Sequence, residues 1–215
     1  MKRDEKTKSA RDKIIKAAFS LFSEKGYEAT STQDIISLTG LSRGAMYHHF
    51  KSKQEILETV TRQAQEQIHS FLEALVTDST LSAKNKLSKI IAYNGESEVQ
   101  KQLIACRWLE KIPFALVEEI RNLNHIIAPC LAQIIRQGVE EKEFECPYIE
   151  ELAEMLALLL DIWLDPVLFN RTYEAICTRL DFVAFMLEKL GADILEKGTV
   201  SRIKSLYQAA SGPVR

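Results

Sequence analysis

The chain has 215 residues, of which 46% are apolar and 27% charged, and it contains only eight glycines and five prolines. This composition excludes a disordered or collagen-like chain and favours helices over a fold of many strands and turns. The net charge of −2 is unevenly divided: residues 1–53 hold 11 Lys and Arg against 6 Asp and Glu, a net charge of +5, whereas residues 54–215 hold 17 against 24, a net charge of −7.

Apolar residues at helical spacing predict four helices in the N-terminal third. The first covers residues 9–25, with Ser9 as its cap and Gly26 as its stop. Two short helices follow, the second at about 43–50, and then a long helix at about 53–76. The side chains expected to face inward in the short helices are Ile35, Ile36, Leu38, Leu41, Met46 and Phe50.

Side chains that cap helices mark where three of these helices begin. Ser31 stands three residues before Asp34, which is a variant of the capping box. Ser52-Lys53-Gln54-Glu55 is the full box, so a helix is expected to start at Lys53. Ser42 is placed to cap the second short helix.

The rest of the chain also has the pattern of helices, and no internal repeat. Prolines and capping residues set most of the expected boundaries. The expected helices cover residues 81–94, a segment from Ser97 to just before Pro113, residues 113–143 with a kink at Pro129, a segment from Pro147 to Leu164, residues 173–190 ended by Gly191, and residues 192–210.

Thr39-Gly40-Leu41 interrupts the helical pattern where a tight turn would set the two short helices at a steep angle. The second helix of such a helix-turn-helix unit fits the DNA major groove. Its polar face carries Ser42, Arg43, Tyr47 and His48 and has no acidic side chain. A generic helical hairpin would explain the apolar spacing equally well.

Residues 10–57 distinguish these two interpretations, because they resemble the DNA-binding domain of the TetR family of bacterial transcriptional repressors. Ile36 and Thr39 depart from the family pattern, which usually has Ala there, and they suggest slightly altered packing. Ala45 and His49 replace a frequent Thr and a common aromatic residue, which affects the expected base preference. The matching residues are Ala17-Ala18, Leu21-Phe22, Gly26-Tyr27, Thr30-Ser31-Thr32, Asp34-Ile35, Gly40-Leu41-Ser42-Arg43-Gly44, Tyr47-His48 and Phe50-Lys51-Ser52-Lys53.

The resemblance implies an all-α fold with a DNA-binding domain at residues 1–52 and a helical ligand-binding and dimerisation domain at residues 53–215. The expected partner is a palindromic double-stranded operator, read in the major groove by Ser42, Arg43, Gly44, Ala45 and Tyr47. Arg43 is the best candidate for a guanine contact. The residues expected at phosphates are Thr32, Gln33, His48 and Lys53.

The resemblance also implies a homodimer, formed by the two very apolar helices near the C-terminus. Apolar residues nearly all round a helix fit a central core helix equally well. The residues expected at the dimer interface are Leu152, Met155, Leu159, Ile176, Leu180, Val183, Met186 and Leu187.

A pocket for a small-molecule effector is the third implication. Asp161, a carboxylate within an apolar run, suggests a lipophilic cation held between Trp108 and Trp163, unless Asp161 pairs with Arg107. The residues expected to line the pocket are Tyr93, Leu103, Arg107, Trp108, Phe114, His125, Leu131, Ile134, Asp161, Trp163 and Phe169.

Two further features bear on location and chemistry. The charged start MKRDEKTKSARDK lacks the apolar stretch of a secretory leader, and the most apolar segment, 155–164, is too short for a membrane span, so a cytoplasmic protein is expected. Four cysteines without metal-ligand spacing predict free buried thiols and no metal site. A thiol sensor at Cys106 or Cys130 is the alternative; the other two are Cys146 and Cys177.

Taken together, these features predict a ligand-responsive regulator, most simply a repressor released from its operator by a small lipophilic effector. An activator, a thiol-responsive regulator of the same fold and a helical regulator that acts by binding another protein are the alternatives. No cofactor and no catalytic residue is expected, because the sequence lacks the P-loop, G-x-G-x-x-G, H-E-x-x-H and G-x-S-x-G motifs.

Overall fold

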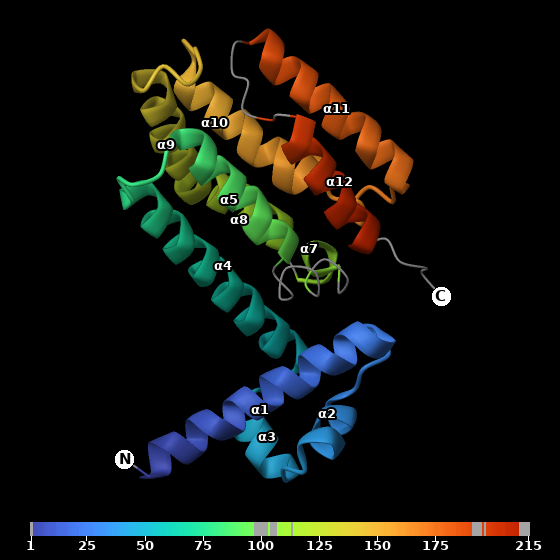
Figure 1. The fold of residues 1–215 in the computed structure, drawn as a ribbon. Helices are drawn as coiled ribbons and strands as arrows, with labels where there is room; N and C mark the ends of the chain where they lie inside the picture. Colours follow the sequence, from blue (N-terminus) through green and yellow to red (C-terminus); the bar gives the residue numbers. More distant parts are fainter. Residues whose placement is uncertain are drawn as a thin grey trace. The chain divides into compact units, whose positions relative to one another are not determined.

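A computed structural model describes residues 2–96, 103, 107–112, 114–190, 195 and 197–210. In this part of the chain all regular structure is helical (Figure 1), which confirms the predicted fold class. The helices are α1 (Lys2–Lys25), α2 (Thr32–Thr39), α3 (Arg43–His49), α4 (Lys53–Thr77), α5 (Ala83–Glu96), α7 (Trp108–Lys111), α8 (Ala115–Asn122), η1 (Leu123–Ile127), α9 (Ala128–Glu140), α10 (Ile149–Leu158), η2 (Leu159–Trp163), α11 (Tyr173–Lys189) and α12 (Lys197–Ala210).

The chain forms two compact units. The first unit comprises Met1–Glu66 with Gln102–Ala115, and the second comprises Gln67–Lys101 with Leu116–Arg215. The division falls inside α4, and the first unit also takes in α7 from the middle of the chain. The functional boundary expected after residue 52 stays a prediction.

The core of the first unit is built from α1, α2, α3 and the start of α4. Its largest side chains are almost completely buried: Phe22, Phe50, Ile14, Ile35, Met46, Ile56 and Leu57. The expectation that Leu38 faces inward is wrong, because its side chain is 57% exposed. Ile35 and Ile36 already occupy the buried face of the two-turn helix α2.

The core of the second unit gathers side chains from α5, α9, α10, α11 and α12 around one apolar cluster. Ile135, Leu180 and Val183 have no exposed surface. The hydrophobic effect over this many buried side chains is the main favourable contribution to its stability. None of the described helices is long and apolar enough to cross a membrane.

Two of the three features expected at prolines differ in detail from the sequence prediction, and the third, the boundary at Pro113, lies outside the described residues. The kink expected at Pro129 takes the form of a π-helical turn, η1, in which the N–H of Ala128 bonds the carbonyl of Leu123. Pro129 lacks an N–H and cannot continue the α-helical ladder, so the wider turn precedes it. Pro147 is not the first helical residue, because α10 starts at Ile149 after Tyr148.

The first and last helices begin at residues other than those predicted. The first helix begins at Lys2, so Ser9 lies inside α1 rather than at its cap. The last helix begins at Lys197, although residues 192–194 and 196 lie outside the described residues. The helix expected to begin at Ser97 also lies outside them.

Gly138 on α9 provides a test of this packing. A Cβ atom there would lie 2.2 Å from Cζ of Phe144 and 2.9 Å from Cβ of Ala83. Gly138→Ala should therefore lower the free energy of unfolding by about 1–3 kcal/mol through overpacking, measured by urea denaturation. Gly198→Ala on α12 meets nothing within 4 Å and serves as the matched control. Equal stability of the two variants would contradict the packing described.

Candidate DNA-binding site

The start of α2 is fixed by a reciprocal cap, as predicted from Ser31 and Asp34. The hydroxyl of Ser31 accepts from the N–H of Asp34 at 3.1 Å, and the Asp34 carboxylate accepts from the N–H of Ser31 at 2.8 Å. Hydrogen bonds from the Ser31 backbone, followed by those from the Ser31 hydroxyl and Lys25, lower the pKa of Asp34 to about 2. The carboxylate is therefore ionised, and holds the cap, at any physiological pH.

The turn between α2 and α3 depends on Gly40. Its backbone is left-handed, with φ of 66°, and its N–H donates to the carbonyl of Ile36 at 3.0 Å. Thr39, where the TetR pattern usually has Ala, adds a side-chain bond to the carbonyl of Ile35 at 2.9 Å. This departure from the family pattern therefore stabilises the end of α2.

Helix α3 begins at the predicted cap, where the Ser42 hydroxyl accepts from the N–H of Ala45 at 3.1 Å. Met46 is buried against the core and anchors the helix, while Ser42, Arg43 and Gly44 are exposed along its start. Tyr47 and His48 are also exposed. Most of the residues predicted to read the groove therefore share one accessible surface.

Arg43 is available for a base contact. Its guanidinium carbon lies 5.6 Å from the ring centroid of Tyr47, and Arg43 forms no ion pair with any described carboxylate. The Tyr47 hydroxyl is 3.3 Å from the hydroxyl of Thr32, which links α3 to α2. This hydrogen bond, opposed by desolvation and helped by Arg43, lowers the pKa of Tyr47.

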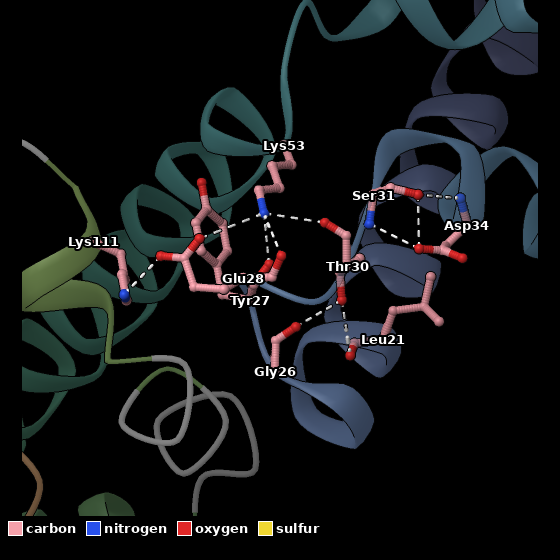
Figure 2. A network of polar contacts seen from close by, with 9 residues as sticks. All are labelled: Leu21, Gly26, Tyr27, Glu28, Thr30, Ser31, Asp34, Lys53 and Lys111. Atoms are coloured by element: carbon pink, nitrogen blue, oxygen red, sulfur yellow. Dashed lines mark hydrogen bonds and ion pairs between the residues drawn. The ribbon is translucent and has the colours of Figure 1, made fainter.

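Lys53, predicted to contact phosphate, instead holds the connection between α1 and α2 (Figure 2). Its ammonium donates to the carbonyls of Tyr27 at 2.7 Å, Thr30 at 3.1 Å and Glu28 at 3.3 Å. It also lies 4.4 Å from the centroid of the Tyr27 ring. These contacts use its three N–H donors, so a phosphate contact by Lys53 stays a prediction that would require some of them to break.

The same connection is tied to α7. Lys111 donates to the Glu28 carboxylate at 2.7 Å (Figure 2), and this hydrogen bond is the largest of the effects that lower the pKa of Glu28. Thr30 completes the network, with its hydroxyl donating to the carbonyl of Gly26 at 2.8 Å. Sequence reasoning missed this network, because Lys111 and Glu28 are 83 residues apart.

The second predicted capping box is altered. The Ser52 hydroxyl accepts from the N–H of Glu55 at 3.1 Å, as expected. The Glu55 carboxylate accepts from the N–H of Lys51 at 2.7 Å rather than from that of Ser52. The side chains of Ser52 and Glu55 therefore still accept backbone N–H groups at the start of α4.

The residues predicted to line an effector pocket are divided between the two units. Leu103, Arg107, Trp108 and Phe114 belong to the first unit. Leu103 is part of its core at 2% exposure, whereas Phe114 is 79% exposed. The others belong to the second unit: Tyr93, His125, Leu131, Ile134, Asp161, Trp163 and Phe169.

Within the second unit these side chains have different surroundings. Leu131 and Ile134 belong to the apolar core, and Tyr93 stacks on Phe71 at a centroid distance of 4.3 Å. His125 lies on a cleft of about 820 Å³ between the end of α4 and the η1–α9 segment. The other lining residues of the cleft are His69, Ser70, Glu73, Ala74, Val76, Thr77, Ile126, Pro129, Cys130 and Gln133.

The lipophilic-cation site expected between Trp108 and Trp163 stays a prediction, because these residues belong to different units. Trp163 is already covered by two of the chain's own guanidinium groups, those of Arg171 and Arg179. Arg107 makes a bidentate pair with Glu110 in the first unit, whereas Asp161 belongs to the second unit. Asp161 keeps exposed surface, yet desolvation by the surrounding protein, followed by two neighbouring carboxylates, raises its pKa well above the ordinary range.

A thiol sensor at Cys130 is not favoured by its environment. Cys130 is buried, and desolvation, followed by the charge of Glu73, raises the pKa of its thiol. The thiolate, which is the reactive form, is therefore less populated than in a free cysteine. Cys106 lies outside the described residues.

Five of the eight residues expected at a dimer interface are buried inside their own chain. Leu152, Ile176, Leu180, Val183 and Leu187 are each 4% exposed or less. A partner could reach these side chains only by opening the core. The exposed apolar side chains on the same two helices, α10 and α11, are Leu158, Phe182 and Phe185.

Helical structure throughout the described residues, a capped helix-turn-helix unit and an accessible second helix are the features of a helix-turn-helix DNA-binding regulator. Residues 14–60 match the family described as bacterial regulatory proteins, tetR family. Residues 14–60 therefore form a DNA-binding domain of the TetR family of transcriptional regulators, which confirms the predicted family.

Three proteins illustrate the relationship. The HTH-type transcriptional repressor KstR2 of Mycolicibacterium smegmatis is 41% identical over 54 residues, which cover 25% of this chain and about a quarter (26%) of that protein. KstR2 of Mycobacterium tuberculosis is 28% identical over 149 residues, covering 63% of this chain and 70% of that protein. The solved structure of the TetR family transcriptional regulator PfmR from Thermus thermophilus matches with a TM-score of 0.55 and 28% identity, over 82% of this chain and 95% of that one.

Gly40→Ala tests the turn. A Cβ atom at Gly40 meets no neighbour within 4 Å, so only the left-handed backbone is penalised, by about 1–2 kcal/mol. We expect the free energy of unfolding, measured by urea denaturation, to fall by that amount. Gly44→Ala, inside α3 and equally uncrowded, should be neutral or stabilising by up to about 1 kcal/mol. A Gly40 variant as stable as the Gly44 variant would rule out the strained turn.

Lys53→Met tests whether Lys53 holds the α1–α2 connection or contacts phosphate. Loss of the carbonyl contacts should lower the free energy of unfolding by about 1–3 kcal/mol. The slope of log affinity against log salt for DNA should stay unchanged, whereas a lost phosphate contact would reduce it by about 0.9. Lys51→Met, an exposed neighbour, is the control and should leave folding unchanged. If the Lys53 variant is as stable as the parent but shows a reduced salt slope, Lys53 contacts phosphate rather than holding the α1–α2 connection.

Proposed function

We propose that the protein is a homodimeric repressor that binds a palindromic operator through α3 and is released by a small lipophilic effector. The accessible face of α3 carries this proposal. It exposes Arg43 without a carboxylate partner among the described residues, and the helix contains no acidic side chain. Such a surface suits both the phosphates and the guanine edges of the major groove.

The direction of regulation rests on the relatives. Both KstR2 proteins are named as transcriptional repressors, and repression by occupying an operator requires only DNA binding. An activator would need an additional surface for the transcription machinery. Repression is therefore the simpler proposal, and a DNA-binding regulator of this kind would work in the cytoplasm.

The dimer surface that fits the burial pattern consists of Leu158 on α10 with Phe182 and Phe185 on α11. These side chains are 42%, 53% and 56% exposed in one chain. Exposed apolar side chains gathered on neighbouring helices mark an interaction surface. A twofold axis through this face would give two α3 helices, as a palindromic operator needs.

Effector response would use α4, the helix that belongs to both units. Its first residue, Lys53, holds the α1–α2 connection, and its last turns belong to the second unit. An effector that prefers one arrangement of the second unit would therefore act on the DNA-binding unit through α4. The coupling free energy of such systems is typically about 1–3 kcal/mol.

Arg43→Ala tests the assignment of α3. On duplex DNA from upstream of its own gene, followed by fluorescence anisotropy, the variant should lose roughly 1–3 kcal/mol of binding free energy. Discrimination among operators with single base substitutions should be relaxed at one base pair per half-site. Arg121→Ala, which removes an exposed arginine paired with Glu118 in the second unit, should bind as the parent does. Unchanged operator affinity in the Arg43 variant would count against α3 as the reading helix.

Phe185→Glu tests the dimer face. Burying a carboxylate in an apolar interface is costly, so the dimer dissociation constant, from analytical ultracentrifugation, should rise by at least about tenfold. Phe114→Glu changes another exposed phenylalanine, in the first unit, and should leave dimerisation unaffected. A dimer that survives the Phe185 change and dissociates in the Phe114 variant would place the interface elsewhere.

A further inference from the structure

Two arginines crowd one tryptophan in the second unit. The guanidinium carbons of Arg171 and Arg179 both lie 5.5 Å from the ring centroid of Trp163. Arg171 also lies over Phe169, at 4.2 Å from that ring centroid. Phe182 meets the edge of Trp163 at a centroid distance of 6.3 Å. The result is a cluster of two cations and three aromatic rings where η2 leads into α11.

Neither guanidinium forms an ion pair with a carboxylate among the described side chains. Arg171 donates to the backbone carbonyl of Trp163, and Arg179 donates from Nη1 to the carbonyl of Ala175 at 2.9 Å. The Nε atom of Arg179 is buried and has no hydrogen-bond partner in the described part of the chain. A buried donor without a partner costs free energy.

The two charges also act on each other. Burial, followed by the proximity of Arg179, lowers the pKa of Arg171, and Asp165 offsets only part of this effect. Guanidinium groups nevertheless stay protonated in proteins. Asp165 already accepts from the N–H groups of Val167 and Leu168 through Oδ1, at 2.7 and 2.6 Å. Two like charges therefore remain close together at a partly buried aromatic surface.

We propose that Arg171, Arg179 and Trp163 form a binding site for a small organic anion, with a carboxylate between the guanidinium groups and an apolar body against the aromatic rings. Guanidinium is the group best suited to a planar carboxylate, because its N–H donors match the two oxygens. Phe169, which is 45% exposed, offers apolar surface to the rest of the ligand. This inference rests on the proposed function only where it makes the anion the effector.

The two positive charges at this site disfavour organic cations. An organic cation would need the face of an electron-rich ring, and the chain's own arginines lie at that of Trp163. An uncharged ligand of the same shape would bury the rings but leave both guanidinium groups without a counter-charge. The site should therefore discriminate by charge rather than by size alone.

Calorimetric titration of the full chain, without DNA, with benzoate and its uncharged analogue benzamide tests the site. We expect saturable benzoate binding at least about tenfold tighter than benzamide binding, the effect of a charge-assisted hydrogen bond. Arg171→Gln and Arg179→Gln should each weaken benzoate binding by about tenfold or more. Arg121→Gln, remote in sequence and paired with Glu118, should leave it unchanged. Equal binding of benzoate and benzamide, no saturable binding, or unaffected Arg171 and Arg179 variants would overturn the proposal.

A replacement variant and a dimerisation measurement cover a folding failure and a competing occupant of the site. If Arg179→Gln does not fold, Arg179→Lys takes its place, because it keeps the positive charge but lacks the planar set of guanidinium donors. Its affinity for benzoate should fall below that of the parent protein but stay higher than its affinity for benzamide. A carboxylate from a second copy of the chain is the competing occupant. In that case the Gln variants would weaken dimerisation in ultracentrifugation and benzoate would not bind, which overturns the small-anion site.

The regulatory part is tested separately by adding benzoate to the protein–operator complex. Release of the operator from the parent protein, but not from Arg179→Gln, would make the anion site an effector site. Benzoate binding without release would overturn that regulatory part and leave the anion site itself supported. Because binding is measured without DNA, failure of operator binding, which would remove the proposed function, remains distinguishable from failure of the anion site.

Discussion

The ammonium of Lys53 is the contact on which the arrangement of the first unit depends. It is the first residue of α4, and it reaches back to the carbonyls of Tyr27, Glu28 and Thr30 in the connection between α1 and α2. These carbonyls follow the end of α1, where no further helical N–H can satisfy them. One side chain therefore fixes where α2 starts relative to α4, and α3 follows through the Gly40 turn. The exposed face of α3 is thus linked to α4, the helix that continues into the second unit.

The second unit shows the opposite situation, in which polar groups are incompletely matched. Arg171 and Arg179 share Trp163 without an ion pair in the described region, while desolvation, followed by two neighbouring carboxylates, raises the pKa of Asp161. A unit selected for stability alone would replace such groups with apolar ones. Such groups beside an apolar core are the observation on which the proposed anion site rests.

Local patterns predicted what local physics determines. The caps at Ser31 and Ser42 and the turn at Gly40 involve atoms a few residues apart, so sequence alone located them. Periodicity predicts helices but not which side of each is covered, so Leu38 is exposed although it was expected to face inward. Leu180 is buried inside its own chain, which the pattern allowed as the alternative to a dimer interface. The partners of Lys53, Glu28 and Arg179 come from segments distant in sequence or from the placement of a ring. No local pattern encodes those contacts, and they appear only in the folded chain.

The most direct test of the central claim is whether the protein selects a DNA sequence through α3. Fluorescence anisotropy of the purified protein on duplex DNA from upstream of its own gene, against a scrambled duplex of equal length over a series of salt concentrations, measures this. We expect the protein to bind the upstream duplex about a thousandfold or more tighter than the scrambled one, with a steep salt dependence for both. Equal, weak binding to the two duplexes, with a genome-wide pull-down that enriches no site, would contradict it.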